Sequence, residues 1–296
     1  MPAEITDSLA LPCLSLSSTE WRQREAVHRA RVAEHAEAFV QRRSAGEKHP
    51  VWDFLFTYYS FSPGKLMTWC PGLAEAEDSQ MNPGLDGDGE QRTWEWPVLP
   101  ERVRREAAWV ARLCANIVAR PARFACHGLH EWAMVYKQSA EQVRHNGYEL
   151  RMTPEELAAF VESQSICCTH YDAFRFYTPE ARPLNTFDPR FETRLEMEQG
   201  GCLHANMDLY KWAYKLWPWI GSDLVADAFE VALFGRAMDM RASPYDLKAL
   251  GFPPIHIETE VGRAEYRRCQ QELAERAEPV RKKLESAAAA LSRLPG

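Results

Sequence analysis

Apolar positions recur at helical spacing along most of this chain, and caps and helix breakers divide them into separate segments. The pattern predicts a long helix over about residues 20–43, opened by the capping sequence Ser17-Ser18-Thr19-Glu20 and ended by Gly46 and Pro50. No segment alternates strongly between apolar and polar residues, as a half-buried strand would. The same criteria predict further helices over about 101–119, 130–143, 154 onward, 203–217, 222–241 and 258–292.

Three segments depart from this pattern. Residues 1–16 are expected to form a loose leader, and residues 71–100 a polar, irregular loop that is richest in turn residues over 81–89. Residues 51–61 are too aromatic for a surface and are expected to form a buried helix, although their β propensity leaves a strand open. We therefore predict a mainly α fold, a single-domain helical bundle over residues 17–296 with a long irregular loop.

Composition and charge narrow the class of protein. The chain has 296 residues, of which 46% are hydrophobic and 26% charged, and this composition is that of an ordinary globular core. Its net charge of −7 gives no overall attraction to nucleic acid, so any DNA contact needs a local basic patch. The most basic stretch is either a solvated helix face or a phosphate-contacting patch formed by Arg102, Arg104, Arg105, Arg112, Arg120 and Arg123.

The sequence also bears on location. The first residues lack the basic and apolar regions of a signal peptide, and no run of about 18 apolar residues is present to span a bilayer. The eight cysteines form no CxxC pair and no small disulfide framework. We expect reduced thiols, a cytoplasmic location and no membrane contact.

Histidines and carboxylates fall inside aromatic-rich segments, where a buried charge must be paired or bound to a ligand. The segments are Cys126-His127-Gly128-Leu129-His130-Glu131-Trp132, Thr169-His170-Tyr171-Asp172 and Cys202-Leu203-His204-Ala205-Asn206-Met207-Asp208. We expect these segments to line one pocket.

In the first segment, His127, His130 and Glu131 have i, i+3, i+4 spacing and share one side of a helix. That spacing suits metal ligands or a coupled acid–base pair, although it matches neither HExxH nor HxxEH. The alternative is one capping histidine and one core histidine bonded to a carbonyl.

The second and third segments allow similar pairs. His204 and Asp208 have i, i+4 spacing, so Asp208 either orients His204 as a general acid or pairs with Lys211 or Lys215. In regular structure His170 and Asp172 share a face only in a strand, which predicts extended backbone there. Asp239-Met240-Arg241 likewise offers a carboxylate and a guanidinium close to Tyr245 and Asp246, and an internal salt-bridge network is the simpler interpretation for Arg241. The chain contains no GxGxxG, GxxxxGK[ST] or GxSxG and no zinc-ribbon cysteine spacing, which excludes the common nucleotide, hydrolase and finger motifs.

Several blocks resemble a bacterial family, frequent in actinomycetes, whose members usually carry the label 3-methyladenine DNA glycosylase. The resemblance covers about residues 20–277, although the helix-hairpin-helix of other alkylpurine glycosylases is missing. The blocks are Lys48-His49-Pro50, Asp53-Phe54-Leu55-Phe56-Thr57-Tyr58-Tyr59-Ser60, Gly128-Leu129-His130-Glu131-Trp132-Ala133-Met134-Val135-Tyr136, His170-Tyr171-Asp172-Ala173-Phe174-Arg175-Phe176, Met207-Asp208-Leu209-Tyr210-Lys211-Trp212-Ala213-Tyr214-Lys215-Leu216 and Asp239-Met240-Arg241-Ala242-Ser243-Pro244-Tyr245-Asp246-Leu247.

The resemblance implies a DNA N-glycosylase that removes an alkylated purine without a cofactor. Such an enzyme flips the base, stacks it on aromatic rings and stabilises an oxocarbenium-like sugar with a carboxylate. Our expected catalytic residues are Glu131, Asp208, His130, His204 and Asp172. The expected substrate-binding residues are Trp132, Tyr136, Tyr58, Trp212 and Arg241, with DNA held by the basic patch.

Two other classes fit the same residues. One is a helical metalloenzyme, similar to a nonheme iron oxygenase, that acts on a small molecule with iron or another divalent metal. Its ligand pool comprises His130, Glu131, His170, Asp172, His204 and Asp208. The other is a non-catalytic protein that binds a small molecule in a polar-lined pocket.

Overall fold

The computed structural model describes residues 11, 13–76, 90–139, 142–143 and 147–294, and it confirms the mainly α fold. Short 3-10 turns at Arg182–Leu184 and Lys248–Leu250 interrupt the loops. The α-helices are α1 (Ser18–Ala45), α2 (Phe54–Thr57), α3 (Pro63–Met67), α5 (Glu101–Ala119), α6 (Leu129–Ala133), α7 (Pro154–Glu162), α8 (Tyr171–Phe174), α9 (Arg194–Met197), α10 (Leu203–Lys215), α11 (Ser222–Ala242) and α12 (Glu260–Arg293).

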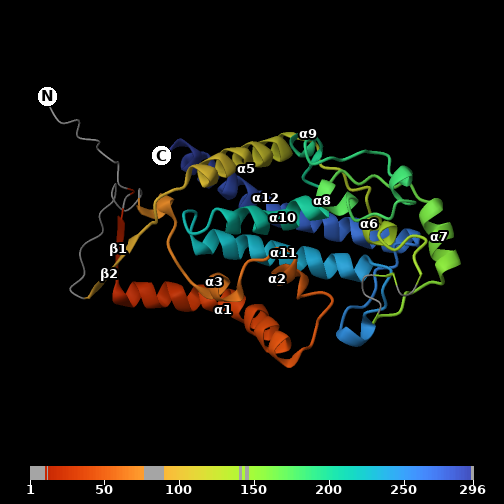
Figure 1. Cartoon of the computed structure of the whole chain (residues 1–296), viewed down its shortest axis with the longest axis horizontal. Helices are drawn as coiled ribbons and strands as arrows, with labels where there is room; N and C mark the ends of the chain where they lie inside the picture. The colour runs from red at the N-terminus through yellow and green to blue at the C-terminus, as the bar shows by residue number, and fades with distance from the viewer. Residues whose placement is uncertain (1–10, 12, 77–89, 140–141, 144–146, 295–296) are drawn as a thin grey trace.

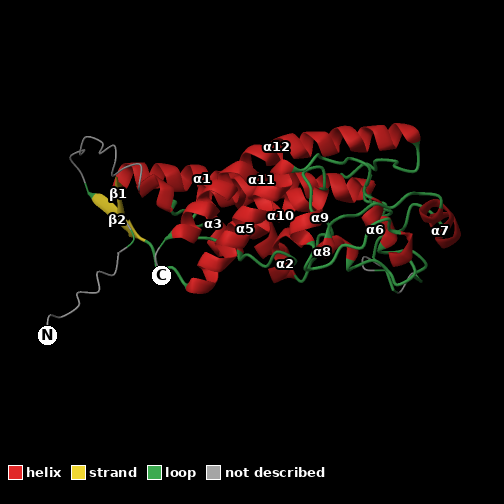
Figure 2. Ribbon diagram, turned by 90° about the horizontal axis from the view of Figure 1, so that it is seen from above, coloured by secondary structure: helices red, strands yellow, loops and turns green. Residues whose placement is uncertain are grey.

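The long helices of the described residues form an elongated bundle of α1, α5, α10, α11 and α12 (Figures 1 and 2). Helix α10 packs along α11, α5 packs along α12, and α12 also contacts both α10 and α11. Helix α1 lies on the outer side of α11. The short helices α6 and α7 lie at one end of the bundle, and the two strands lie at the other.

Helix α10 runs through the centre and is buried on nearly every side, as its apolar and aromatic composition requires. It packs tightly against α11, where a Cβ added at Gly235 would lie 2.6 Å from Met207 Cγ. The absence of a side chain at Gly235 therefore lets the two helices come together. His204 lies one turn before Met207, and Asp239 lies one turn after Gly235.

Caps and amphipathic stripes explain the helix boundaries that the sequence predicts well. The Ser17 hydroxyl accepts a hydrogen bond from the Glu20 backbone N–H at the start of α1, and Gly46 ends it in the left-handed region at φ +71°. Helix α5 has the predicted bounds, and its buried residues recur at helical spacing. Helix α7 opens with a full capping box between Thr153 and Glu156.

Two predicted helices are much shorter than expected. The helix expected over 130–143 is only α6, because the chain leaves helical geometry after Ala133 and Lys137 adopts φ +55°. In the aromatic segment 51–61 only α2 is helical, and Ser60 at φ +56° turns the chain away. Burial of apolar side chains, rather than helix length, holds both segments in the core.

The expected leader and loop contain a strand each, which corrects the prediction of loose structure there. Strands β1 (Cys13–Ser17) and β2 (Gln91–Glu95) pair antiparallel, with Leu14 opposite Trp94. The alternation of Leu14 and Leu16 with polar residues supports this pairing, because it buries Leu14 and leaves Ser15 exposed. The whole of the turn-rich segment 81–89 predicted within the loop, and residues 77–80 before it, lie outside the described residues.

Within the described part of the chain, none of the helices is both long enough and apolar enough to cross a membrane.

Candidate metal centre and adjoining cavity

His130 is placed by a sharp turn that starts α6. Gly128 caps the helix at φ +75°, and a Cβ there would lie 3.2 Å from both the Tyr266 ring and Ala242 Cβ. This close packing fixes α6 against α11 and α12. The His130 ring then meets Asp239 of α11, with Nε2 2.7 Å from Oδ1 and both side chains almost fully buried.

The short contact is that of a charge-assisted hydrogen bond in which an imidazolium donates to a carboxylate. Burial by itself lowers the pKa of His130, but the charge of Asp239 and the hydrogen bonds of Asp239 and Cys126 raise that pKa well above its ordinary value. Burial raises the pKa of Asp239, but the charge and hydrogen bond of His130 and the charge of Arg236 together bring it below its ordinary value. Arg236 Nη1 lies 3.2 Å from Asp239 Oδ2 and holds the other carboxylate oxygen.

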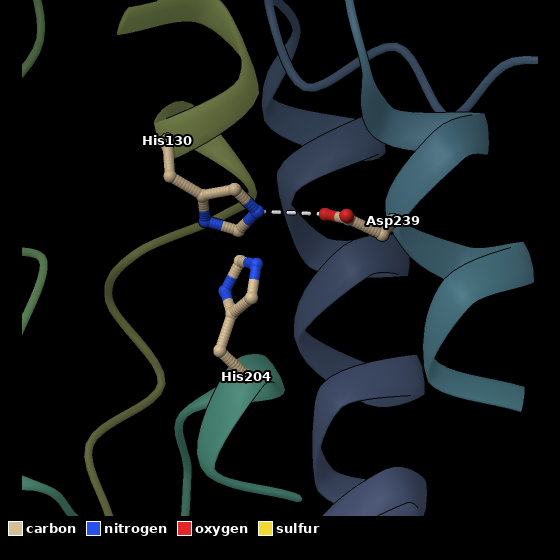
Figure 3. A group of neighbouring side chains, drawn as sticks. All are labelled: His130, His204 and Asp239. Carbon is tan, nitrogen blue, oxygen red and sulfur yellow. Dashed lines mark hydrogen bonds and ion pairs between the residues drawn. The ribbon is translucent and has the colours of Figure 1, made fainter. Parts of the chain in front are cut away.

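His204, from the first turn of α10, faces this pair (Figure 3). Its ring centroid lies 4.5 Å from that of His130, and one ligand atom from each of His130, His204 and Asp239 lies within 4.8 Å of the others. Burial and the charge of His130 lower the pKa of His204 well below its ordinary value. His204 is therefore neutral and keeps a free lone pair for a metal or a proton.

A partly enclosed cavity of about 230 Å³ adjoins His130 and His204. Its wall is largely apolar and includes Leu203, Phe187 and the thiols of Cys126, Cys167, Cys168 and Cys202. Burial raises the pKa of Cys167 to about 11 and that of Cys168 to about 12, so these thiols stay protonated near neutral pH. All eight cysteines are free, in keeping with the expected reduced thiols.

A second polar cluster lies behind the cavity and is centred on Asp208 of α10. Asp208 Oδ2 lies 3.3 Å from Arg194 Nη2 and 3.5 Å from Lys211 Nζ, while Tyr59 Oη donates to Oδ1 at 3.2 Å. Lys211 also donates to Asp172 at 2.6 Å. Burial raises the pKa of Asp208, but Lys211, His170 and Arg194 lower it far below its ordinary range.

His170 links the two clusters. Its ring stacks on His204 at 5.5 Å between centroids, and its Nε2 lies 3.4 Å from Asp208 Oδ2 and 3.6 Å from Glu198 Oε1. The backbone is extended at His170, the N-cap residue of α8, as predicted. It is helical at Asp172, where the prediction of extended backbone is wrong. The three histidines therefore form a continuous row from Asp239 to Asp208.

The predicted pool of polar residues thus divides between two sites. His130 and His204 meet at the cavity, whereas His170, Asp172 and Asp208 belong to the cluster behind it. Glu131 was expected at the site, but it belongs to neither group. Its carboxylate pairs with Arg236 at 3.4 Å. Asp208 pairs with Lys211, one of the open alternatives, while Lys215 donates to Glu106 instead.

The predicted aromatic and arginine contacts are also dispersed. Trp132 is fully buried and donates to the Ala242 carbonyl, Tyr136 donates to Glu162, and Arg241 pairs with Glu265. These contacts place the three side chains in the structural core or at helix contacts. Tyr58 and Trp212 border the Asp208 cluster: burial raises the pKa of Tyr58 to about 12, and Arg194 lies over the Trp212 ring at 5.0 Å.

Sequence reasoning missed Asp239 as the partner of His130, and it missed the cavity residues Tyr266 and Gln270. The only local signal for Asp239 is its i, i+3 spacing from Arg236, which indicates a salt bridge and nothing more. His130 and Asp239 meet through tertiary packing, which no spacing rule reports.

Two arginines of the basic patch are engaged within the molecule. Arg104 donates to the Leu294 carbonyl, and Arg120 donates to the Glu198 and Leu195 carbonyls. The side chains at 102, 105, 112 and 123 are exposed.

Comparisons with protein-family models, curated proteins and solved structures find no match for this chain. Function is therefore inferred from the site itself, and the resemblance to the labelled glycosylase family stays a prediction.

Proposed function

We propose that this protein is a metal-dependent enzyme in which His130, His204 and Asp239 hold a divalent transition metal beside a small apolar cavity. The observation that carries the proposal is the convergence of two imidazoles and one carboxylate at the cavity edge. Two histidines and one carboxylate with open positions are the ligands typical of nonheme iron(II) oxygenases. Iron(II) is therefore the first candidate, and oxidation of a small molecule is the reaction class.

The donor atoms suit such an ion once His130 loses the proton that it donates to Asp239, because a ligating imidazole must be neutral. Ligand nitrogens and oxygens lie about 2.0–2.2 Å from a bound metal, so the observed spread of up to 4.8 Å needs only a small contraction. Arg236 holds Asp239 Oδ2 and leaves Oδ1 toward the histidines. Cys126 Sγ lies 3.4 Å from His130 Nδ1 and helps to fix the ring orientation.

The surrounding residues support the same chemistry. The apolar cavity wall limits water beside the proposed ion, and the fully buried His170 ring packs behind His204. The metal would supply open coordination positions for oxygen and substrate when bound. The chain itself orients the proposed metal ligands and surrounds them with a largely apolar wall.

The N-glycosylase activity implied by the resemblance has weaker geometric support. It requires a carboxylate free to face a sugar, and Asp208, Asp172 and Glu131 are each paired with a cation. A non-catalytic binding protein would use the same cavity without a metal.

Metal analysis tests the proposal. After anaerobic incubation with iron(II) and removal of free metal, we expect about one iron per chain in the natural protein and near-complete loss in His204→Ala. His204 contributes ring packing without a hydrogen bond to any described residue, so this variant should fold. His256→Ala is the matched control, because that imidazole is 54% exposed and lies near Glu258. Equal iron in all three proteins, or none in the natural protein, would overturn the proposed metal centre.

A further inference from the structure

An arginine without a carboxylate partner lies at the edge of the cavity beside His130 and His204. Arg123 is exposed and lines this cavity, and its side chain makes no hydrogen bond or ion pair with any residue that the structure describes. The nearby carboxylate of Asp188 pairs with Arg190 at 2.6 Å instead. Because a guanidinium stays charged in proteins, Arg123 brings an uncompensated positive charge to the cavity edge.

Two contacts show that the Arg123 guanidinium lies beside the cavity wall. Its Cζ atom lies 5.7 Å from the centroid of the Phe187 ring, and Phe187 lines the cavity. Burial raises the pKa of Cys167, a second lining residue, and the charge of Arg123 acts on that pKa in the opposite direction. The guanidinium is therefore close to two side chains of the wall, one aromatic and one a thiol.

The backbone of Arg123 is held in place by a neighbouring loop. Its N–H donates to Gln199 Oε1 at 2.8 Å, and Gln199 Nε2 donates to the Arg123 carbonyl at 3.3 Å. A Cβ added at Gly201 would collide with the same carbonyl oxygen, so Gly201 lets the two segments come together. A side chain that starts from a fixed backbone loses less freedom when it binds a ligand.

The charges around the cavity favour an anion over other ligands of the same size. No Asp or Glu is among the described residues that line it. An ammonium is repelled by Arg123, and a neutral group gives the guanidinium no more than water does. A carboxylate can accept two parallel N–H bonds from one guanidinium. A phosphate dianion would need a second free cation at the same edge.

We propose that the cavity binds a small carboxylic acid with an apolar body, whose carboxylate accepts hydrogen bonds from the Arg123 guanidinium. The apolar body packs on Leu203 and Phe187. The cavity of about 230 Å³ is larger than the ~150 Å³ cavity known to hold benzene, so an acid of roughly nine non-hydrogen atoms fits. This assignment rests on the proposed function, because it names the substrate class for the same cavity.

Three probes test the assignment on the full, metal-free chain by ligand-observed NMR titration. Benzoate and benzamide have the same shape and differ in charge, whereas acetate carries the charge without the apolar body. We expect benzoate to bind about tenfold more tightly than benzamide and at least about tenfold more tightly than acetate. Equal affinities of benzoate and either other probe, or no binding of benzoate, would overturn the assignment.

Variants of Arg123 separate its charge from its hydrogen bonds. Arg123→Gln should weaken benzoate about tenfold and leave benzamide unchanged, and Arg123→Lys should lie between Arg123→Gln and the natural protein for benzoate. Both variants should fold, because the side chain has no hydrogen bond to lose within the described residues.

Arg105→Gln is the matched control, because it removes the same charge from a side chain of α5 that is 75% exposed beside Glu101. It should bind benzoate as the natural protein does. Unchanged benzoate affinity in Arg123→Gln, or equal losses in Arg123→Gln and Arg105→Gln, would contradict the proposal.

The outcomes remain distinguishable from those for the metal. A preference for benzoate that depends on Arg123, in a chain that takes up no iron, would sink the proposed metal centre alone. One iron per chain together with equal benzoate affinity in Arg123→Gln would sink the carboxylate assignment alone.

Discussion

Asp208 is a buried carboxylate on which several charged side chains depend. Arg194, Lys211 and His170 surround its carboxylate, and the side chain is 2% exposed. Bringing this charge out of water is costly, and its neighbours offset the cost. Removing the charge leaves buried cations without full compensation.

We therefore expect Asp208→Asn to lower the free energy of unfolding by about 3–5 kcal/mol at pH 7. The measurement is urea denaturation followed by circular dichroism. Asp188→Asn is the control, because that carboxylate is 63% exposed beside Arg190, and it should change stability by less than about 0.5 kcal/mol. Losses of similar size in the two variants would contradict the role given to Asp208.

The pH dependence of this variant has a definite sign. The folded-state pKa of Asp208 lies below its unfolded value, so its stabilisation is complete above about pH 4 and is lost as the pH falls through the folded pKa. Asp208→Asn should consequently show a shallower loss of stability on acidification than the natural protein.

At the scale of single residues, sequence reasoning finds which groups are costly to bury but not which partners they meet. His130 and His204 were expected at one pocket, and they do meet there. The expected salt-bridge network concerned Arg241, and no sequence pattern predicted that Asp239 meets His130, because the approach of α6 to α11 depends on packing at Gly128. Trp132 was assigned to the substrate because an aromatic residue beside a histidine looks the same in sequence whether it faces a cavity or the core.

At the scale of elements, the contact between α10 and α11 determines the spacing of the proposed ligands. Gly235 allows that contact, and it lies one turn from Asp239, while Met207 lies one turn from His204. A wider separation of the helices would move the His204 imidazole away from the Asp239 carboxylate.

Gly235→Ala should lower the free energy of unfolding by about 1–3 kcal/mol, because the new methyl group meets Met207. It should also weaken iron binding several-fold, since ligand geometry depends on this contact. Gly64→Ala in α3 is the control: no atom lies within 4 Å of its added Cβ, and no loss of stability is expected. If Gly235→Ala lost stability but bound iron with unchanged affinity, the contact between α10 and α11 would not determine the ligand geometry.

Elements with their own end signals were predictable, and elements made by distant contacts were not. Helices α1, α5 and α7 have caps or amphipathic stripes within their own residues. Strand β1 needs β2, and α6 stops after Ala133, before the chain turns at Lys137 with φ +55°. Local propensity cannot report either event.

At the scale of the whole molecule, net charge and the state of the basic patch limit nucleic-acid binding. The chain carries −7 overall, and Arg104 and Arg120 donate to backbone carbonyls. Only the exposed arginines of the patch are available for phosphates without rearrangement.

We expect binding to duplex DNA to be weak and its salt dependence shallow. Each phosphate contact contributes roughly −0.9 to the slope of log affinity against log salt, so the exposed arginines allow a slope no steeper than about −3.6. Fluorescence anisotropy over a salt series measures this, with Arg112→Gln as the test and Arg276→Gln on α12 as the control. A steeper slope, together with release of bases from alkylated DNA, would favour the glycosylase class over the metal centre.

The position of His130 on a five-residue helix has a consequence for the order of folding. So short a helix does not persist alone in water, so we expect His130 to reach its place only after the long helices have packed and Gly128 has docked on Tyr266. Metal uptake would then be a late step, limited by the docking of this segment and not by diffusion of the ion. A chain arrested before that step would be compact and helical, yet unable to retain its metal.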